Sequence, residues 1–171
     1  MPFDHIWAGW RNAYVSGVAQ VEPTPGECVF CSVLSADATD RERLVVHRGA
    51  TCVVMLNLFP YGSGHLLLMP TRHLARLEEL KPDEQTELFE LLVEASATLN
   101  KAYVPDGLNL GANLGRAGGA GVPGHLHFHA LPRWSGDTNF MATVGETRVI
   151  PEDLMTTYDK IAEAWTQVRP E

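Results

Sequence analysis

Cysteine and long apolar runs are scarce in this sequence. The chain has 3 cysteines among 171 residues, too few and too odd a number for a disulfide framework. No apolar run approaches the roughly 18 residues that a membrane-spanning helix needs, and residues 1–4 lack the basic-then-apolar pattern of a signal peptide. These absences predict a cytoplasmic protein with reduced cysteines and no membrane partner.

Basic side chains are also in short supply. The sequence contains 13 Lys and Arg residues against 21 Asp and Glu residues, a formal net charge of −8. Binding to nucleic acid or to a membrane surface needs clustered Lys and Arg, so this balance argues against both partners. A small phosphate ester is not excluded, because backbone N–H groups in a glycine-rich turn bind anions locally whatever the global charge.

The length and the 45% share of hydrophobic residues suit one domain with a sizeable core. We expect an N-terminal extension over residues 1–27, a main domain over residues 28–150, and a C-terminal helix and tail over residues 151–171. The extension should pack on the body through its aromatic side chains, since it has few charges. These side chains are Trp7, Trp10 and Tyr14.

Hydrophobic periodicity predicts the secondary structure. Apolar runs over residues 51–59 and 65–69, separated by a Pro- and Gly-containing segment, predict two adjacent antiparallel strands. A helix start at Pro82 and apolar residues at helical spacing predict a long helix to Tyr103. Further strands are predicted over residues 108–115 and 125–131, and a second helix over residues 151–168. This pattern places the chain in the α+β class, with an antiparallel sheet, one long central helix and a C-terminal helix.

Three histidines alternate with apolar residues in the last predicted strand. His125, His127 and His129 therefore share one face, and the intervening apolar residues take the other, buried face. A histidine-rich solvent-facing strand is one interpretation, but it leaves the clustering to chance. A catalytic metal centre is the second, although successive residues on one strand rarely converge on one ion. The third, which we favour, is nucleophilic catalysis, in which a neutral imidazole attacks phosphorus beside an anion-binding glycine-rich loop.

A Cys-x-x-Cys pair, Cys28 and Cys31, has the spacing of metal ligands. The two residues could instead be small buried hydrophobes, a frequent fate of free cysteine. A redox role is disfavoured because no βαβ pattern surrounds the pair. Cys52, alone in an apolar run, is predicted to lie in the core.

The segment Gly124-His-Leu-His-Phe-His-Ala-Leu131 resembles the signature of the histidine-triad (HIT) family. Other pieces resemble the same family in the same order and together cover most of the chain: Leu56-Asn57, Gly64-His65-Leu-Leu-Leu-Met69-Pro70, Asn113 and Pro132-Arg133-Trp134. Three more resemble a bacterial branch described as diadenosine tetraphosphate phosphorylases or ATP adenylyltransferases: Ile6-Trp-Ala-Gly-Trp-Arg11, Cys28-Val-Phe-Cys31 and Gly136-Asp-Thr-Asn-Phe140.

The resemblance implies catalytic roles for three histidines. His127, the middle residue of the triad, would be the nucleophile, and His129 would assist at the phosphate. His65 would support the nucleophile strand from the neighbouring strand. No catalytic metal is required for this chemistry.

The resemblance also implies the nucleotide-binding residues. Asn57 would hold the ribose hydroxyls, while Asn113 and the loop with Gly119 and Gly121 would join His127 and His129 at the phosphate. Glycines there can expose several N–H donors to developing phosphate charge. The chain departs from the family at residues 121–123, where many members have Gln, Ser or Thr and this sequence has Gly-Val-Pro.

A structural zinc is implied in the same way. His73 and His125 resemble the third and fourth ligands of zinc-bearing members, which would complete a closed Cys2His2 site with Cys28 and Cys31. His47 is the alternative third ligand.

The expected reaction has two displacements through a nucleotidyl-histidine. The leading substrates are dinucleoside polyphosphates, with diadenosine tetraphosphate and inorganic phosphate giving ADP and ATP. The alternatives are hydrolysis of adenosine phosphoramidates or other AMP conjugates, and a non-catalytic nucleotide-binding regulatory module. A homodimer is expected from the resemblance alone.

Overall fold

The computed structural model describes residues 28–137 and 152–169. The predicted N-terminal extension with Trp7, Trp10 and Tyr14 lies outside the described residues, and so do residues 138–151. Among the described residues, no helix is both long enough and apolar enough to cross a membrane.

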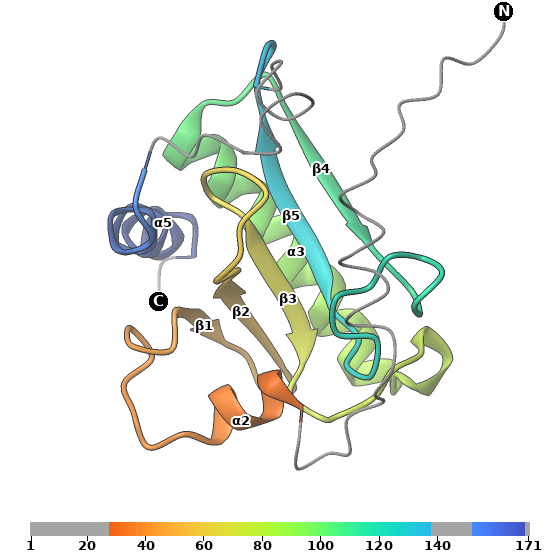
Figure 1. Ribbon diagram of the computed structural model, residues 1–171. Helices are drawn as coiled ribbons and strands as arrows, with labels where there is room; N and C mark the ends of the chain where they lie inside the picture. Colours follow the sequence, from red (N-terminus) through yellow and green to blue (C-terminus); the bar gives the residue numbers. More distant parts are fainter. Residues whose placement is uncertain (1–27, 138–151, 170–171) are drawn as a thin grey trace, which may run out of the picture.

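A five-stranded antiparallel sheet, ordered β1-β2-β3-β5-β4, lies in front of a long helix, α3 (Figure 1). The strands are β1 (Val45–Arg48), β2 (Cys52–Leu56), β3 (Leu66–Pro70), β4 (Gly107–Ala112) and β5 (Phe128–Arg133). The helices are α2 (Val29–Ser35), the 3-10 helix η1 (Leu77–Glu79), α3 (Pro82–Tyr103) and α5 (Leu154–Val168). Helix α5 packs on α3 and contacts β1. The predicted α+β class is confirmed.

Helix α3 has the bounds that the sequence predicts. Pro82 occupies its first turn, where a missing N–H costs nothing, and Glu84 accepts a hydrogen bond from the Lys81 N–H at 2.8 Å. The hydrogen-bonded Arg72 guanidinium lowers the pKa of the buried Glu84 carboxyl to about 2. The helix stops at Val104, which adopts a left-handed conformation with φ 46°. These local signals set both ends of the helix.

The strand predictions hold with shifted ends. The two apolar runs form β2 and β3, which pair antiparallel with Leu56 opposite Leu66. Strand β5 begins at Phe128, three residues later than predicted, and helix α5 begins at Leu154 because Asp153 caps its first N–H groups. Helix α2 and strand β1 were not predicted.

Both faces of the central strands are covered. Alternate residues of β2 and β3 pack against α3 on one side, and the residues between them form a second cluster on the other side. The second cluster comprises Val45, Val53, Met55, Leu67 and Met69 with Cys28 and Phe30 near the start of α2. Cys52 is fully buried on the α3 side, as predicted, and burial raises the pKa of its thiol to about 11. Helix α2 therefore covers the sheet face opposite α3.

Candidate active site and metal cluster

The histidines of the triad lie on the sheet face opposite α3. The apolar residues that alternate with them, Leu126, Phe128 and Ala130, pack in the core under α3. His129 pairs across the sheet with Leu67, a member of the α2-side cluster. The ring centroids of His127 and His129 are 5.0 Å apart. The structure thus brings the two imidazoles together as the alternation predicts.

The hydrogen bond of His127 fixes its tautomer. Its Nδ1 lies 2.7 Å from the carbonyl oxygen of His125, and a carbonyl oxygen only accepts, so Nδ1 carries the proton and Nε2 keeps its lone pair. The residue is 5% exposed. Burial lowers its pKa, and the bond to the His125 carbonyl raises it by less. His127 is therefore a neutral imidazole with an unprotonated Nε2, the form that can attack phosphorus.

A chain of hydrogen bonds gives His129 the opposite tautomer to His127. The backbone N–H of Tyr61 donates to His65 Nδ1 at 3.0 Å, so the His65 proton is on Nε2, which lies 2.9 Å from His129 Nδ1. The remaining proton of His129 is then on Nε2, a buried atom without a hydrogen-bond partner in the described part of the chain. Burial and the neighbouring His127 lower the pKa of His129 to about 4. His129 therefore presents a neutral N–H donor, and His65 acts on His129.

Asn57 lies directly after β2, beside His65. Its backbone N–H donates to the His65 carbonyl at 2.9 Å, and its Oδ1 accepts from the Phe59 N–H at 3.0 Å. Its Nδ2 is 3.4 Å from His65 Nδ1. The carboxamide is thus held in a fixed orientation by its own loop, with one lone pair and one proton left for a ligand.

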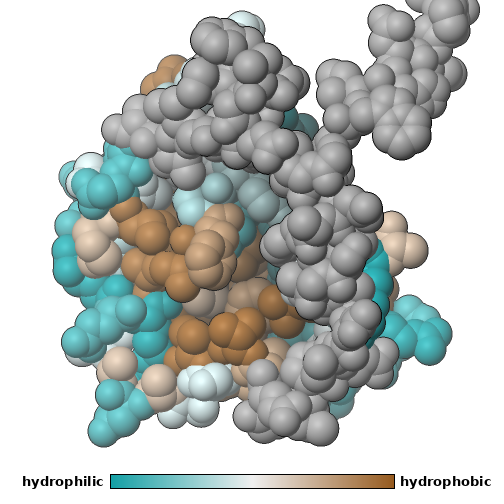
Figure 2. All heavy atoms as spheres, in the orientation of Figure 1, coloured by the Kyte–Doolittle hydropathy of each residue, from teal (hydrophilic) through white to brown (hydrophobic). Residues whose placement is uncertain are grey.

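Apolar side chains of the loop over residues 57–63 lie at the surface. Leu58 is 58% and Phe59 79% exposed. Apolar residues gather in the middle of this face (Figure 2). Such a surface suits the uncharged base of a nucleotide better than a polyanion.

In the glycine-rich loop before β5, some backbone N–H groups already donate to carbonyl groups of the same loop. Gly115 and Gly119 adopt positive φ values of 67° and 87°, which only glycine takes readily. The N–H of Gly119 donates to the Arg116 carbonyl, and that of Ala120 to the Gly115 carbonyl. The Gly121 N–H has no partner among residues 28–137 and 152–169. The predicted donor density is therefore lower than the glycine count suggests.

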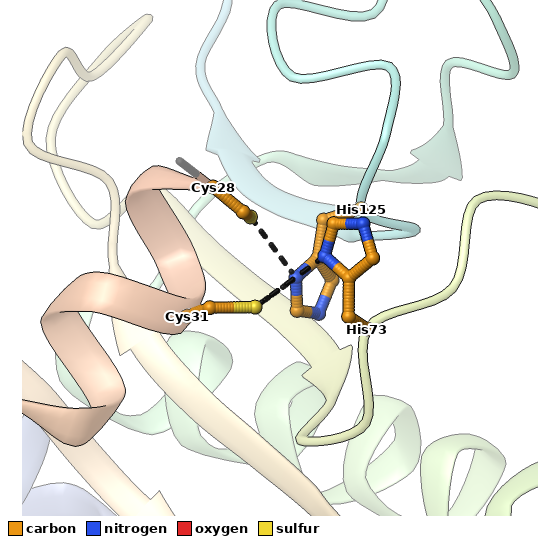
Figure 3. A group of neighbouring side chains, drawn as sticks. All are labelled: Cys28, Cys31, His73 and His125. Atoms are coloured by element: carbon orange, nitrogen blue, oxygen red, sulfur yellow. Dashed lines mark hydrogen bonds between the residues drawn. The ribbon is translucent and has the colours of Figure 1, made fainter. Parts of the chain in front are cut away.

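Four side chains from three segments point toward one another and form a Cys-His cluster (Figure 3). They are Cys28, Cys31, His73 and His125, and one donor atom of each lies within 4.8 Å of the others. Cys28 Sγ is 3.4 Å from His125 Nδ1, and Cys31 Sγ is 3.4 Å from His73 Nδ1. Tetrahedral zinc with ordinary bond lengths separates sulfur and nitrogen ligands by about 3.6 Å.

The chemistry of the donors also fits a metal ion. His125 Nε2 lies 2.9 Å from the Pro70 carbonyl and must donate to it, which leaves the Nδ1 lone pair directed to the cluster. His47, the alternative ligand, lies elsewhere, stacked on Trp165 and hydrogen-bonded to Arg169. The residues present therefore fit a closed zinc site with His73 as third ligand.

Two residues at the site were missed from the sequence. Tyr61 sets the tautomer of His65 through its backbone and lies 5.7 Å from His129, ring to ring. Phe30 contacts the ring of His127. Both lie inside segments already singled out, the loop before β3 and the Cys-x-x-Cys pair, but only the folded chain brings them to the triad.

Comparisons with known proteins point to one family. The HIT domain model matches residues 39–136. The "AP-4-A phosphorylase" of Mycobacterium tuberculosis (strain H37Rv) is 40% identical over 167 residues, which cover 95% of this chain and 84% of the relative. The "Bis(5'-nucleosyl)-tetraphosphatase [asymmetrical]" of Schizosaccharomyces pombe is 33% identical over 54% of this chain and 50% of its own length.

A solved structure extends the similarity to the fold. The "hypothetical histidine triad nucleotide-binding protein ST2152" of Sulfolobus tokodaii strain7 superposes with a TM-score of 0.67 at 27% identity, over 83% of this chain and 94% of that protein. With the family model spanning more than half of the sequence, the chain belongs to the histidine-triad (HIT) family.

Proposed function

We propose that this HIT protein is an enzyme that cleaves dinucleoside polyphosphates through a nucleotidyl-histidine on His127. The observation that carries the proposal is the pair of opposite tautomers. His127 Nε2 is unprotonated, and 5.0 Å away, ring to ring, His129 holds a buried N–H without a partner in the described segments. A nucleophile beside a proton donor is the arrangement that phosphoryl displacement needs.

In the first displacement, His127 Nε2 attacks the α-phosphorus and the bond to the leaving polyphosphate breaks. The His129 N–H stabilises charge on the oxygens of the phosphoryl group, and the Gly121 N–H is a further donor. In the second displacement an acceptor oxygen attacks the same phosphorus and the P–N bond breaks. Asn57 and Asn113 would hold the ribose and the phosphate meanwhile.

We propose inorganic phosphate as the acceptor. The small residues of the loop after Asn113 leave room for a second phosphate, and the relative that matches 95% of this chain is named a phosphorylase. Diadenosine tetraphosphate would then give ATP in the first step and ADP in the second.

Isotope-labelled phosphate tests this assignment. With ¹⁸O-labelled inorganic phosphate, the label is expected in the β-phosphate of ADP and not in ATP, as read by mass spectrometry of the separated products. Release of unlabelled AMP at the same rate without phosphate would move the enzyme to the hydrolase class, to which the name of the Schizosaccharomyces pombe relative belongs. Nucleotide binding without any product would support the regulatory module.

We propose zinc as the ion of the Cys-His cluster. Two thiols and two imidazoles are the donor set of closed structural zinc sites. A bound zinc would crosslink α2, the loop after β3 and the start of the histidine segment. Reduced thiols are needed for it, which agrees with the cytoplasmic location expected from the cysteine count.

We also propose a homodimer. Strand β4 ends the described sheet, so its outer edge has no ladder partner among the described residues, and Leu110 is 50% exposed on it. Open strand edges with apolar side chains readily pair with another chain. Light scattering is expected to give twice the monomer mass, and Leu110→Asp should shift it toward the monomer. A wild-type monomer at micromolar concentration would refute the dimer.

A further inference from the structure

Phe30 connects the metal cluster to the nucleophile. It lies between Cys28 and Cys31 in the first turn of α2 and is 8% exposed. Its ring meets that of His127 edge-on at 5.1 Å between centroids, with an interplanar angle of 63°. It meets the ring of His125 at 5.6 Å and 89°. One aromatic side chain therefore contacts both a candidate metal ligand and the candidate nucleophile.

His127 needs such a contact because its hydrogen bond leaves one rotation open. The bond from Nδ1 to the His125 carbonyl fixes one ring nitrogen, but the ring can still swing about that bond. In-line attack on phosphorus requires the Nε2 lone pair to be aimed to within a narrow angle. An edge-to-face aromatic contact restricts the ring plane, since other angles lose the favourable interaction.

The ring of His127 also meets that of His129 edge-on at 5.0 Å, but the other two constraints originate in the Cys-His cluster. The carbonyl that holds Nδ1 belongs to His125, and Phe30 is flanked in the chain by the two cysteines. Helix α2 has only 7 residues and lacks a side-chain cap at Cys28, so its own hydrogen bonds fix its place weakly. The cysteine contacts to His125 and His73 tie α2 to the body of the domain.

We propose that Phe30 is a positioning residue, through which the Cys-His cluster sets the orientation of the His127 ring. The inference rests on His127 as the nucleophile and adds a residue that the triad signature does not contain. In this arrangement metal occupancy affects the chemical step without the ion approaching the substrate.

Phe30→Leu tests the proposal, because it keeps an apolar side chain at the position and removes the ring. Leu34→Ala is the matched control. Leu34 belongs to the same helix as Phe30 and packs on the same hydrophobic cluster of the α2 side, but it has no ring to contact His127. In single-turnover experiments with diadenosine tetraphosphate, Phe30→Leu should slow formation of the nucleotidyl-histidine by about 10²-fold, the usual cost of a misplaced reacting group. Zinc content and AMP affinity should stay at the wild-type level.

Nitrogen-15 NMR of the histidine rings provides a readout independent of activity. Wild-type His127 should show the Nδ1–H tautomer with sharp signals from its ring C–H groups, and Phe30→Leu should keep that tautomer while the ring C–H signals broaden, because the ring then swings about its hydrogen bond. Phe30→Tyr, which keeps the ring, should show the wild-type spectrum and rate. If Phe30→Leu does not fold, Phe30→Tyr is measured in its place. A Phe30→Leu enzyme with wild-type rate and spectrum would overturn the proposal. Absence of adduct in the wild-type protein would instead count against the proposed function, and the spectra would still decide the role of Phe30.

Discussion

Replacing His127 with alanine is expected to abolish turnover while nucleotide binding survives. In the proposed mechanism the imidazole supplies the protein atom that bonds to phosphorus, so the rate should fall on the order of 10³-fold or more. Affinity should change little, because the proposed nucleotide contacts come mainly from Asn57 and the glycine-rich loop. Steady-state kinetics with diadenosine tetraphosphate and calorimetric titration with AMP measure the two quantities separately.

Two further histidine variants serve as comparisons for His127→Ala. His129→Ala removes a proton donor and leaves the nucleophile, so it should be impaired less than His127→Ala and still form some adduct detectable by mass spectrometry. His47→Ala removes an imidazole on β1 that stacks on Trp165, and it should keep wild-type kinetics. Wild-type turnover in His127→Ala would end the proposed mechanism.

Loss of the two cysteines should have the largest effect on stability. We expect about one zinc per chain by elemental analysis, and none in Cys28→Ser/Cys31→Ser. The free energy of unfolding should fall by several kcal/mol, since structural zinc binds to small folded peptides with about 10–16 kcal/mol. Chelation of the wild-type protein should lower its melting temperature in the same direction, because a ligand of the native state stabilises by mass action.

Cys52→Ala is the matched control for the cysteine variants. Cys52 is fully buried in the core under α3 and does not belong to the cluster. This variant should keep its zinc and lose only the stability expected for a small core cavity. Metal-free protein with full stability and full activity would show that Cys28 and Cys31 are ordinary buried residues.

The sequence predicted best where a local signal determines the structure. Pro82 at the start of α3 and the turn-forming Pro-Asp-Gly of residues 105–107 after its end limit the helix at the residues expected. Alternation placed His127 and His129 on one face because strand geometry is periodic. In contrast, β1 has only 4 residues, half of them polar, and gives no clear period.

The rest of the site depends on contacts between distant segments. Cys28 and His125 are 97 residues apart, and His65 and His129 are 64 apart. Neither the tautomer chain from Tyr61 nor the Phe30 contact has a sequence pattern, because each depends on the packing of a loop or short helix on the sheet. The choice of His73 over His47 as third ligand depends on packing, which the sequence does not show. Only the family resemblance favoured His73 at that point.

The two-sided burial of the histidine segment limits how such an enzyme can diversify. From residue 125 to residue 130, every odd position serves the cluster or the triad, and every even position fills the core under α3. Replacement at any of these positions is expected to lose the proposed chemistry, the Cys-His cluster or core packing. New substrate preferences are therefore expected from mutation of exposed positions in the loops over residues 57–63 and 113–124, other than the glycines with positive φ. The histidine segment is therefore expected to stay constant among related enzymes, while the loops vary with the substrate.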